Sequence, residues 1–165
     1  MEYFDVVNKN RVSLGYQKQR GEELIDDEFN TGVEMWILNN DSILMTKRSM
    51  SKSHPGQWEV PGGCSQAGES SIDTLKREMK EEIGVDFNDD EFRLVGTILY
   101  KRQFVDVYTS NKVINLDDVV LQDEEVSDIK FVNKDEFMNL VNNNSIVPSV
   151  LNRFNIIKEQ LGLDW

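Results

Sequence analysis

The chain has 165 residues, of which 30 are acidic and 18 basic, so its formal net charge is −12. This excess of negative charge argues against nucleic acid or an anionic membrane as the binding partner. The single cysteine excludes an internal disulfide, and no apolar run approaches the ~20 residues that a membrane-spanning helix needs. The first ten residues also lack the basic and apolar segments of a signal peptide, so we expect a cytoplasmic protein.

The length suits a single domain over residues 1–165, with an N-terminal strand extension over about residues 1–30. Apolar runs bounded by turn residues predict eight strands, in chain order Tyr3–Val7, Val12–Gln17, Val33–Leu38, Ser42–Lys47, Phe92–Arg102, Gln103–Ser110, Val119–Gln122 and Asp128–Val132. Apolar residues at helical spacing predict helices over 71–83, 134–142 and 148–161. This mixture of elements is typical of an α/β fold.

The first predicted helix gathers negative charge on one side. Glu78, Glu81 and Glu82 stand at positions i, i+3 and i+4, so their side chains share one helical face. Each like-charge pair costs roughly 0.2–0.5 kcal/mol in an isolated helix. Arg77 reaches Glu81 at i+4, but one guanidinium does not neutralise three carboxylates. A divalent cation that prefers oxygen ligands, such as Mg²⁺, would do so.

The opposite face of this helix is apolar and its ends carry capping residues. Its inward residues are Ile72, Leu75, Met79 and Ile83. Ser70 is a good N-cap, Asp73 completes a variant of the capping box, and Gly84 suits the C-terminal stop. We therefore expect the carboxylates to lie on a helix that is packed and fixed at both ends.

This stretch resembles the Nudix box over residues 63–85. The pattern is a glycine, five residues, a glutamate, seven residues and then Arg-Glu-aliphatic-x-Glu-Glu-x-Gly-aliphatic. All nine positions are matched, by Gly63, Glu69, Arg77, Glu78, Met79, Glu81, Glu82, Gly84 and Val85. Few short patterns are as specific as this one. The preceding residues 58–62 are similar to the strand that leads into the box in this family.

Membership of the Nudix hydrolase superfamily implies an α/β/α sandwich with a mixed β-sheet. It also implies hydrolysis of the diphosphate linkage of a nucleoside diphosphate derivative, with Mg²⁺ or Mn²⁺ as cofactor. The metal ligands would be Glu78, Glu81, Glu82 and the Gly63 carbonyl. Glu69 would either ligate through water or anchor the turn. The Gly62-Gly63 turn would bring the backbone close to the substrate.

The resemblance implies two further catalytic roles. Arg77 would orient a carboxylate of the cluster. The general base would be Glu82 or a glutamate from a late loop, for which Glu125 is the best match and Glu124 the alternative. Without the resemblance, residues 122–125 (QDEE) are typical of a solvated turn.

The loop over residues 48–58 is the basic segment closest in sequence to the acidic helix. Arg48 and Lys52 can bind a diphosphate from the side opposite the metal, or they can be solvated surface residues. Their spacing, followed by Pro55-Gly56-x-Trp58, is similar to the isopentenyl-diphosphate isomerase branch of the superfamily. In that branch, the matching arginine and lysine bind the substrate diphosphate.

The isomerase chemistry itself is poorly matched. That branch uses a cysteine, a glutamate and a histidine-rich metal site, whereas this chain has one histidine, His54. Asn30 and Glu34 stand where the family has histidines, and Cys64 is not in clean register with the family's cysteine. Without a partner that would activate it, Cys64 is expected to be an inert small residue.

Three functions therefore remain open from the sequence: a metal-dependent hydrolase, a prenyl-diphosphate isomerase, and a Nudix-like sensor that binds a nucleotide without cleaving it. All three imply a small-molecule nucleotide or other diphosphate as the ligand. Family resemblance also makes a homodimer an expectation. Trp36, Phe104 and Tyr108 are able to stack on a base, but they are better explained as packing residues.

Overall fold

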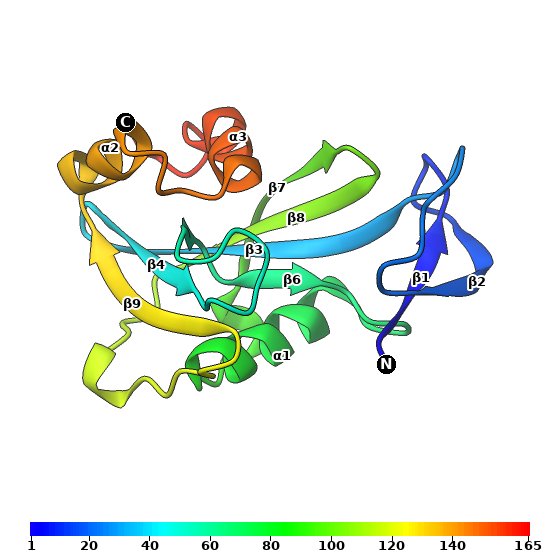
Figure 1. Cartoon of the computed structure of the whole chain (residues 1–165), viewed down its shortest axis with the longest axis horizontal. Coiled ribbons are helices and arrows are strands. Elements are labelled where there is room, and N and C mark those ends of the chain that lie inside the picture. Colours follow the sequence, from blue (N-terminus) through cyan, green and yellow to red (C-terminus); the bar gives the residue numbers. More distant parts are fainter.

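A mixed β-sheet forms the centre of the protein and carries helices on both faces (Figure 1). The computed structural model describes residues 1–165. The strands are β1 (Tyr3–Val7), β2 (Ser13–Gln19), β3 (Asn30–Asn39), β4 (Ser42–Arg48), β5 (Trp58–Glu59), β6 (Gly62–Cys64), β7 (Arg93–Tyr100), β8 (Gln103–Ser110) and β9 (Val126–Val132). The helices are α1 (Ser71–Ile83), α2 (Lys134–Asn142) and α3 (Pro148–Ile157), with 3₁₀ turns at Asp89–Glu91 and Leu116–Asp118.

The long strand β3 organises the sheet. The order is β5-β4-β3-β8-β7, with β6 also paired to β3 and β9 to β4. Strands β3 and β8 run parallel, whereas the other pairings are antiparallel. The predicted α/β/α sandwich with a mixed sheet is therefore confirmed.

Two apolar cores lie on opposite sides of the sheet because side chains alternate along each strand. Met35 and Ile37 of β3 pack toward α1, whereas Trp36 between them packs on the other side. Leu75, Met79 and Ile83 supply the α1 face of the first core. Phe137 of α2 and Phe154 of α3 enter the second core, where Phe154 stacks on Trp36 with ring centroids 5.4 Å apart.

Helix α1 begins and ends at the predicted residues. The Ser70 hydroxyl accepts a hydrogen bond from the Asp73 backbone N–H, and the Asp73 carboxylate accepts one from the Ser70 N–H, which completes the capping box. Gly84 stops the helix in the left-handed conformation, with φ of 72°. The acidic face of α1 is therefore carried by a helix that is fixed at both ends.

Strands β1 and β2 form a separate two-stranded sheet beside the main body (Figure 1). Ala67 N donates to the Tyr3 carbonyl at 2.8 Å, and Gly68 N donates to Asp5 Oδ2 at 2.7 Å. Arg11 donates to both oxygens of the buried Asp106, at 2.7 and 2.8 Å. The hairpin is thus tied to the turn that precedes α1 and to strand β8. The expectation of one domain with an N-terminal extension over residues 1–30 stays a prediction.

Two predicted elements differ from the structure. Residues 119–122 are not a strand, because their backbone binds the end of α1 instead: Val120 N donates to the Ile83 carbonyl at 3.1 Å and Gln122 N to the Glu82 carbonyl at 3.3 Å. The last helix, predicted to reach Leu161, ends at Ile157, and turns follow it to Gly162. None of the three helices combines the length and the apolar character needed to cross a bilayer.

The Gly84→Ala substitution should destabilise the fold for two reasons. An L-residue is strained at this positive φ, and its Cβ would lie 3.0 Å from the Val120 Cβ. We expect a loss of roughly 2–3 kcal/mol in the free energy of unfolding, measured by urea denaturation. Gly15→Ala is the matched control, since Gly15 has φ of 80° but an added Cβ there would meet no atom within 4 Å. Equal losses in both variants would contradict the packing role of Gly84.

Candidate active site

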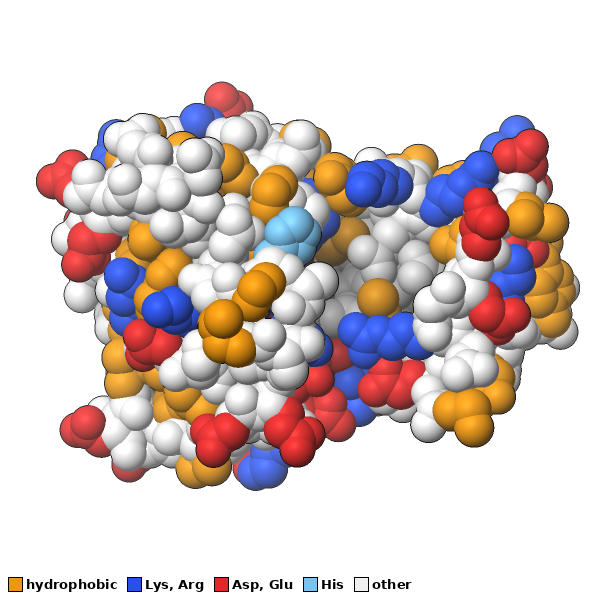
Figure 2. Space-filling view, in the orientation of Figure 1, with side chains coloured by type: hydrophobic (Ala, Val, Ile, Leu, Met, Phe, Trp, Pro, Cys, Tyr) orange, Lys and Arg blue, Asp and Glu red, His pale blue; other side chains and the backbone are white.

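A polar pocket lies between the acidic face of α1, the loop after β4 and the N-terminal hairpin. Figure 2 shows a hollow between the main body and this hairpin, with acidic and basic side chains gathered at its edge. The charged residues that line the pocket are of both signs. The acidic set is Glu2, Glu34, Glu59, Glu78, Glu81, Glu82 and Glu125, and the basic set is Arg20, Arg48, Lys52, Arg77 and Arg153. Gly62 and Gly63 also line it, so the predicted site residues meet in one place, apart from Glu69, which lies behind Arg77.

The three glutamates of α1 differ in their surroundings. Glu78 and Glu82 are buried, at 8% and 5% exposure, while the Glu81 side chain is half exposed. Burial raises the pKa of Glu82 well above its ordinary value, and the nearby charges of Glu78 and Glu59 raise it further. Glu82 has one hydrogen bond, from Gly62 N at 3.2 Å, and no cationic partner. It is therefore a buried carboxylate whose charge nothing in the protein balances.

The two glycines before α1 allow the backbone to approach these carboxylates. A Cβ at Gly63 would lie 2.2 Å from Glu78 Oε1, and one at Gly62 would lie 2.3 Å from the Val33 carbonyl. Gly62 also has φ of 151°, a conformation that L-residues rarely adopt. The absence of side chains at both positions is thus what leaves room for Glu78 and for the turn beside Glu82.

Arg77 connects the glutamates of the box to one another. Its Nε donates to Glu69 Oε1 at 2.6 Å, and its Nη1 donates to Glu78 Oε1 at 2.7 Å and to Glu81 Oε2 at 3.2 Å. Glu69 also accepts bonds from the Gln66 N–H and the Thr74 hydroxyl. Burial alone would raise the pKa of Glu69, but these bonds, led by that from Arg77, lower it. In this arrangement, Glu69 anchors the turn and Arg77 orients Glu78.

Arg48 lies in the pocket but is held by Glu59, a carboxylate that is only 16% exposed. Its Nη1 donates to both oxygens of Glu59, at 2.7 and 2.8 Å, and its Nε donates to the Ser53 carbonyl at 2.5 Å. Burial raises the pKa of Glu59, an effect that the Arg48 charge partly opposes. The arginine therefore both faces the pocket and compensates the partly buried charge of Glu59.

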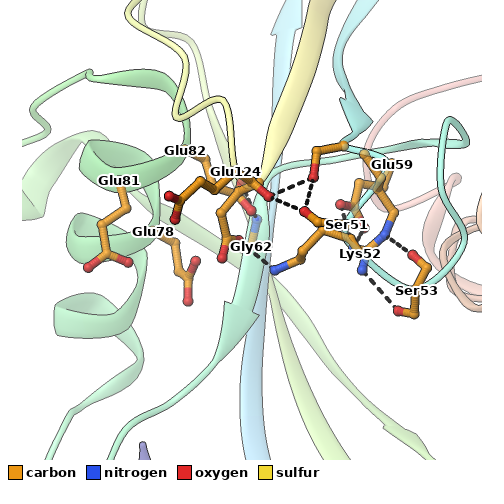
Figure 3. Close-up of polar contacts among 12 residues, drawn as sticks. Ser51, Lys52, Ser53, Glu59, Gly62, Glu78, Glu81, Glu82 and Glu124 are labelled. Atoms are coloured by element: carbon orange, nitrogen blue, oxygen red, sulfur yellow. Dashed lines mark hydrogen bonds and ion pairs between the residues drawn. The ribbon is translucent and has the colours of Figure 1, made fainter. Parts of the chain in front are cut away.

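Lys52 and Glu125 join the basic loop to the late acidic loop. The Lys52 Nζ lies 2.7 Å from Glu125 Oε2, and the Ser49 and Ser51 hydroxyls donate to the Glu124 carbonyl at 2.6 and 2.9 Å. Glu125 lines the pocket, whereas Glu124 does not. Figure 3 shows Glu78, Glu81 and Glu82 on the helix side of the site, the loop of Ser51–Ser53 on the other side, and Gly62 between them.

The donor set fits a divalent cation in its chemistry but is not gathered around a single point. No three side chains among the acidic, histidine and cysteine residues lie close enough together to hold a metal ion. Arg77 holds Glu78 toward Glu69, and mutual repulsion keeps uncompensated carboxylates apart. The donors that Glu78, Glu81, Glu82 and the Gly63 carbonyl would offer are carboxylate and carbonyl oxygens, which are the ligands that Mg²⁺ and Mn²⁺ prefer. The buried, unbalanced charge of Glu82 is what such a cation would neutralise.

Several pocket residues have no counterpart among the sequence-based site predictions. Glu34, Gln103 and Arg153 line the pocket from β3, β8 and α3, and Glu59 lines it from β5. Glu34 is the one charged residue within the apolar run of β3, and Arg153 is the one charged residue within α3. A charge placed inside an apolar element is the signal by which both residues are recognisable.

The three aromatic residues considered for base stacking are packing residues. Trp36 is fully buried, and Phe104 and Tyr108 are each 8% exposed. His54 does not line the pocket, and Cys64 lines it with its Sγ accepting a hydrogen bond from Gln103 Nε2 at 3.1 Å.

The protein is thus an α/β/α sandwich with an acidic pocket. Carboxylates on a capped helix and the glycine turn before that helix line this pocket, and these are the features of a class of α/β enzyme. The NUDIX domain family matches residues 28–153, and the chain belongs to this family. Nudix hydrolase 3 of Arabidopsis thaliana is 34% identical over 156 residues, which are 85% of this chain but only 20% of that protein. An uncharacterized Nudix hydrolase of Listeria monocytogenes is 31% identical over 151 residues, covering 90% of this chain and 89% of the relative.

Solved structures show the same fold. DR0079 from Deinococcus radiodurans has a TM-score of 0.73 at 20% identity, covering 88% of this chain and 92% of that one. A bifunctional NMN adenylyltransferase/ADP ribose pyrophosphatase from Francisella tularensis, complexed with AMP and a Mn ion, has a TM-score of 0.66 at 19% identity, covering 80% and 42% of the two chains. The predicted superfamily and the predicted enzyme class, a Nudix pyrophosphohydrolase, are confirmed.

Removing Arg48 should destabilise the fold by leaving Glu59, whose side chain is only 16% exposed, without its partner. For Arg48→Met, we expect a loss of roughly 3 kcal/mol near pH 7, measured by urea denaturation. Relative to the wild type, the loss should grow as the pH rises through the raised pKa of Glu59, because the ionised carboxylate has Arg48 beside it in the wild type but not in the variant. Well below that pKa, the carboxyl group is protonated in both folded proteins and the loss should be small.

The double variant Arg48→Met/Glu59→Gln is the control for this test. It removes both partly buried charges, so most of the lost stability should return near pH 7. A deficit that is independent of pH, or one that Glu59→Gln does not relieve, would contradict the assigned pairing.

Proposed function

We propose that the protein is a metal-dependent hydrolase that cleaves the diphosphate linkage of a nucleoside diphosphate joined to another group. The observation that carries this proposal is the buried carboxylate of Glu82, which has no cationic partner and faces a pocket that also holds basic side chains. A site with this distribution of charge is suited to bring a cation and a diphosphate together.

The metal, Mg²⁺ or Mn²⁺, would be held by Glu78, Glu81, Glu82 and the carbonyl of Gly63. Such an ion neutralises charge on diphosphate oxygens and lowers the pKa of a bound water. Glu78 is free to turn toward the ion only if it leaves Arg77, which keeps its bonds to Glu69 and to the Cys64 carbonyl. Arg77 would then fix the turn from which the Gly63 carbonyl is presented.

Lys52, Arg48 and Glu125 would act on the substrate from the opposite side. Lys52 is paired with Glu125, so an incoming diphosphate would compete with that carboxylate for the ammonium group. A released Glu125 is able to accept the proton of the attacking water, and Glu82 is the alternative base. Arg48 would contact the diphosphate while remaining bound to Glu59.

The similarity in fold to the Francisella tularensis protein makes ADP-ribose a first compound to test, together with other nucleoside diphosphate derivatives. The polar lining of the pocket supports a small-molecule nucleotide as the ligand. A homodimer and a cytoplasmic location are further parts of the proposal.

The Glu82→Gln substitution should abolish metal binding without weakening the fold. We expect Mg²⁺ or Mn²⁺ to raise the Tm of the wild-type protein, as any ligand of the native state does, and to leave that of Glu82→Gln nearly unchanged. Without metal, the variant should be at least as stable as the wild type, because burial opposes the ionisation of Glu82. Turnover on a nucleotide panel should fall by at least about 100-fold.

Glu159→Gln is the matched control, since Glu159 is exposed and lies outside the pocket. It should keep both the metal-induced rise in Tm and the turnover. Normal turnover in Glu82→Gln, or no effect of either metal on the wild-type protein, would refute the proposed role of Glu82.

The Lys52→Met substitution should raise KM more than it lowers kcat, because Lys52 would bind the diphosphate in the ground state and the transition state alike. We expect about a tenfold rise in KM, measured by phosphate release coupled to a phosphatase. Lys76→Met removes an equal charge from the exposed side of α1, where Lys76 pairs with Asp89, and should leave KM unchanged. An equal rise in both variants would show that only the net charge matters.

A further inference from the structure

Arg153 lines the pocket from α3. Its residue exposure is 8%, and its Nε and Nη2 both donate to Glu34 Oε1, the former at 2.7 Å. The guanidinium also lies over the Tyr100 ring, 5.4 Å from its centroid. Two elements, β3 and β7, therefore fix the orientation of this arginine.

Two residues of the pocket, Arg153 and Gln103, each have a polar atom that no group of the protein binds. Arg153 Nη1 has no hydrogen-bond partner, although the other two nitrogens of the guanidinium are bound to Glu34. Gln103 uses its Nε2 to bind the Cys64 Sγ, and its Oε1 has no partner. Both residues line the pocket. A donor and an acceptor that line one pocket are complementary to hydroxyl groups, which both accept and donate.

We propose that Arg153 and Gln103 form the subsite for the uncharged, hydroxyl-bearing group that the substrate carries beyond its diphosphate. This assignment rests on the proposed function and names the part of the substrate that the metal and the basic loop do not bind. Arg153 and Gln103 would then determine the specificity for the group that is joined to the nucleoside diphosphate.

Charge and surroundings favour an uncharged group over a further phosphate. Glu34 already balances the charge of Arg153, and the two side chains are only 5% and 10% exposed. Val60, Val105 and Val150 line the same pocket. A phosphate against these valines would lose hydration without a free cation to offset it, whereas a sugar can place its hydroxyls on Arg153 and Gln103 and its carbon atoms on the valines.

The test compares two esters of the same nucleoside diphosphate that have equal charge and the same scissile bond. One carries a hexose and the other a simple alkyl group, and both are prepared with each of the four ribonucleosides. The variants are Gln103→Leu and the double variant Arg153→Met/Glu34→Gln, which removes both buried charges so that Glu34 is not left unpaired. Lys52→Met serves as the comparison variant, because it should affect both esters alike.

We expect the double variant to raise KM for the hexose ester about tenfold and to change KM for the alkyl ester less than about twofold. Gln103→Leu should act in the same direction, with a smaller effect. Equal changes on both esters, or no change on either, would overturn the subsite while leaving the hydrolase intact. A wild-type protein that cleaves neither ester with Mg²⁺ or Mn²⁺ would overturn the proposed function, and the subsite with it.

Discussion

The central constraint on this structure is the cost of burying carboxylates close together. Like charges near one another in a medium that excludes water resist ionisation, and each must find a cation or remain protonated. Most of the acidic groups in the pocket meet this requirement within the protein, as Glu59 does with Arg48 and Glu34 with Arg153. Glu82 does not, and its unbalanced charge is what the proposed cation would neutralise.

The same requirement explains why helix α1 is so well fixed. A helix that holds repelling side chains on one face needs packing on the other, which Leu75, Met79 and Ile83 provide. Its N-terminal capping box and its left-handed stop at Gly84 prevent fraying at both ends. The helix that carries the acidic face is thus held by the core and by its caps, while Arg77 binds Glu78 and Glu81 on the face itself.

Much of the fold could be predicted because it depends on local patterns. Alternation along β3 and the 3.6-residue period of α1 predict which residues face which core, and the capping residues give the limits of the helix. The strand predicted over residues 119–122 was wrong because its apolar residues satisfy their backbone at the end of a distant helix. Such a partner is a tertiary contact that no local pattern contains.

The candidate site was likewise predicted where it depends on local patterns and missed where it depends on tertiary contacts. The box spacing and the basic loop predicted residues that lie in one pocket, but they did not predict that each cation would already have a carboxylate beside it. The contribution of α3 was also missed, since Arg153 is 119 positions from Glu34 along the chain. Pairings over such separations arise from topology, which the sequence specifies only through the folded structure.

The backbone bonds from residues 119–122 to the end of α1 have a mechanical consequence. They attach the loop of Glu125 to the same rigid element that carries Glu82, through the carbonyls of Ile83 and Glu82 itself. Any tilt or shift of the helix therefore carries the two candidate proton acceptors in concert. The distance between Glu82 and Glu125 is therefore fixed by these backbone bonds. It should stay nearly constant during motions that alter the distance from α1 to the basic loop.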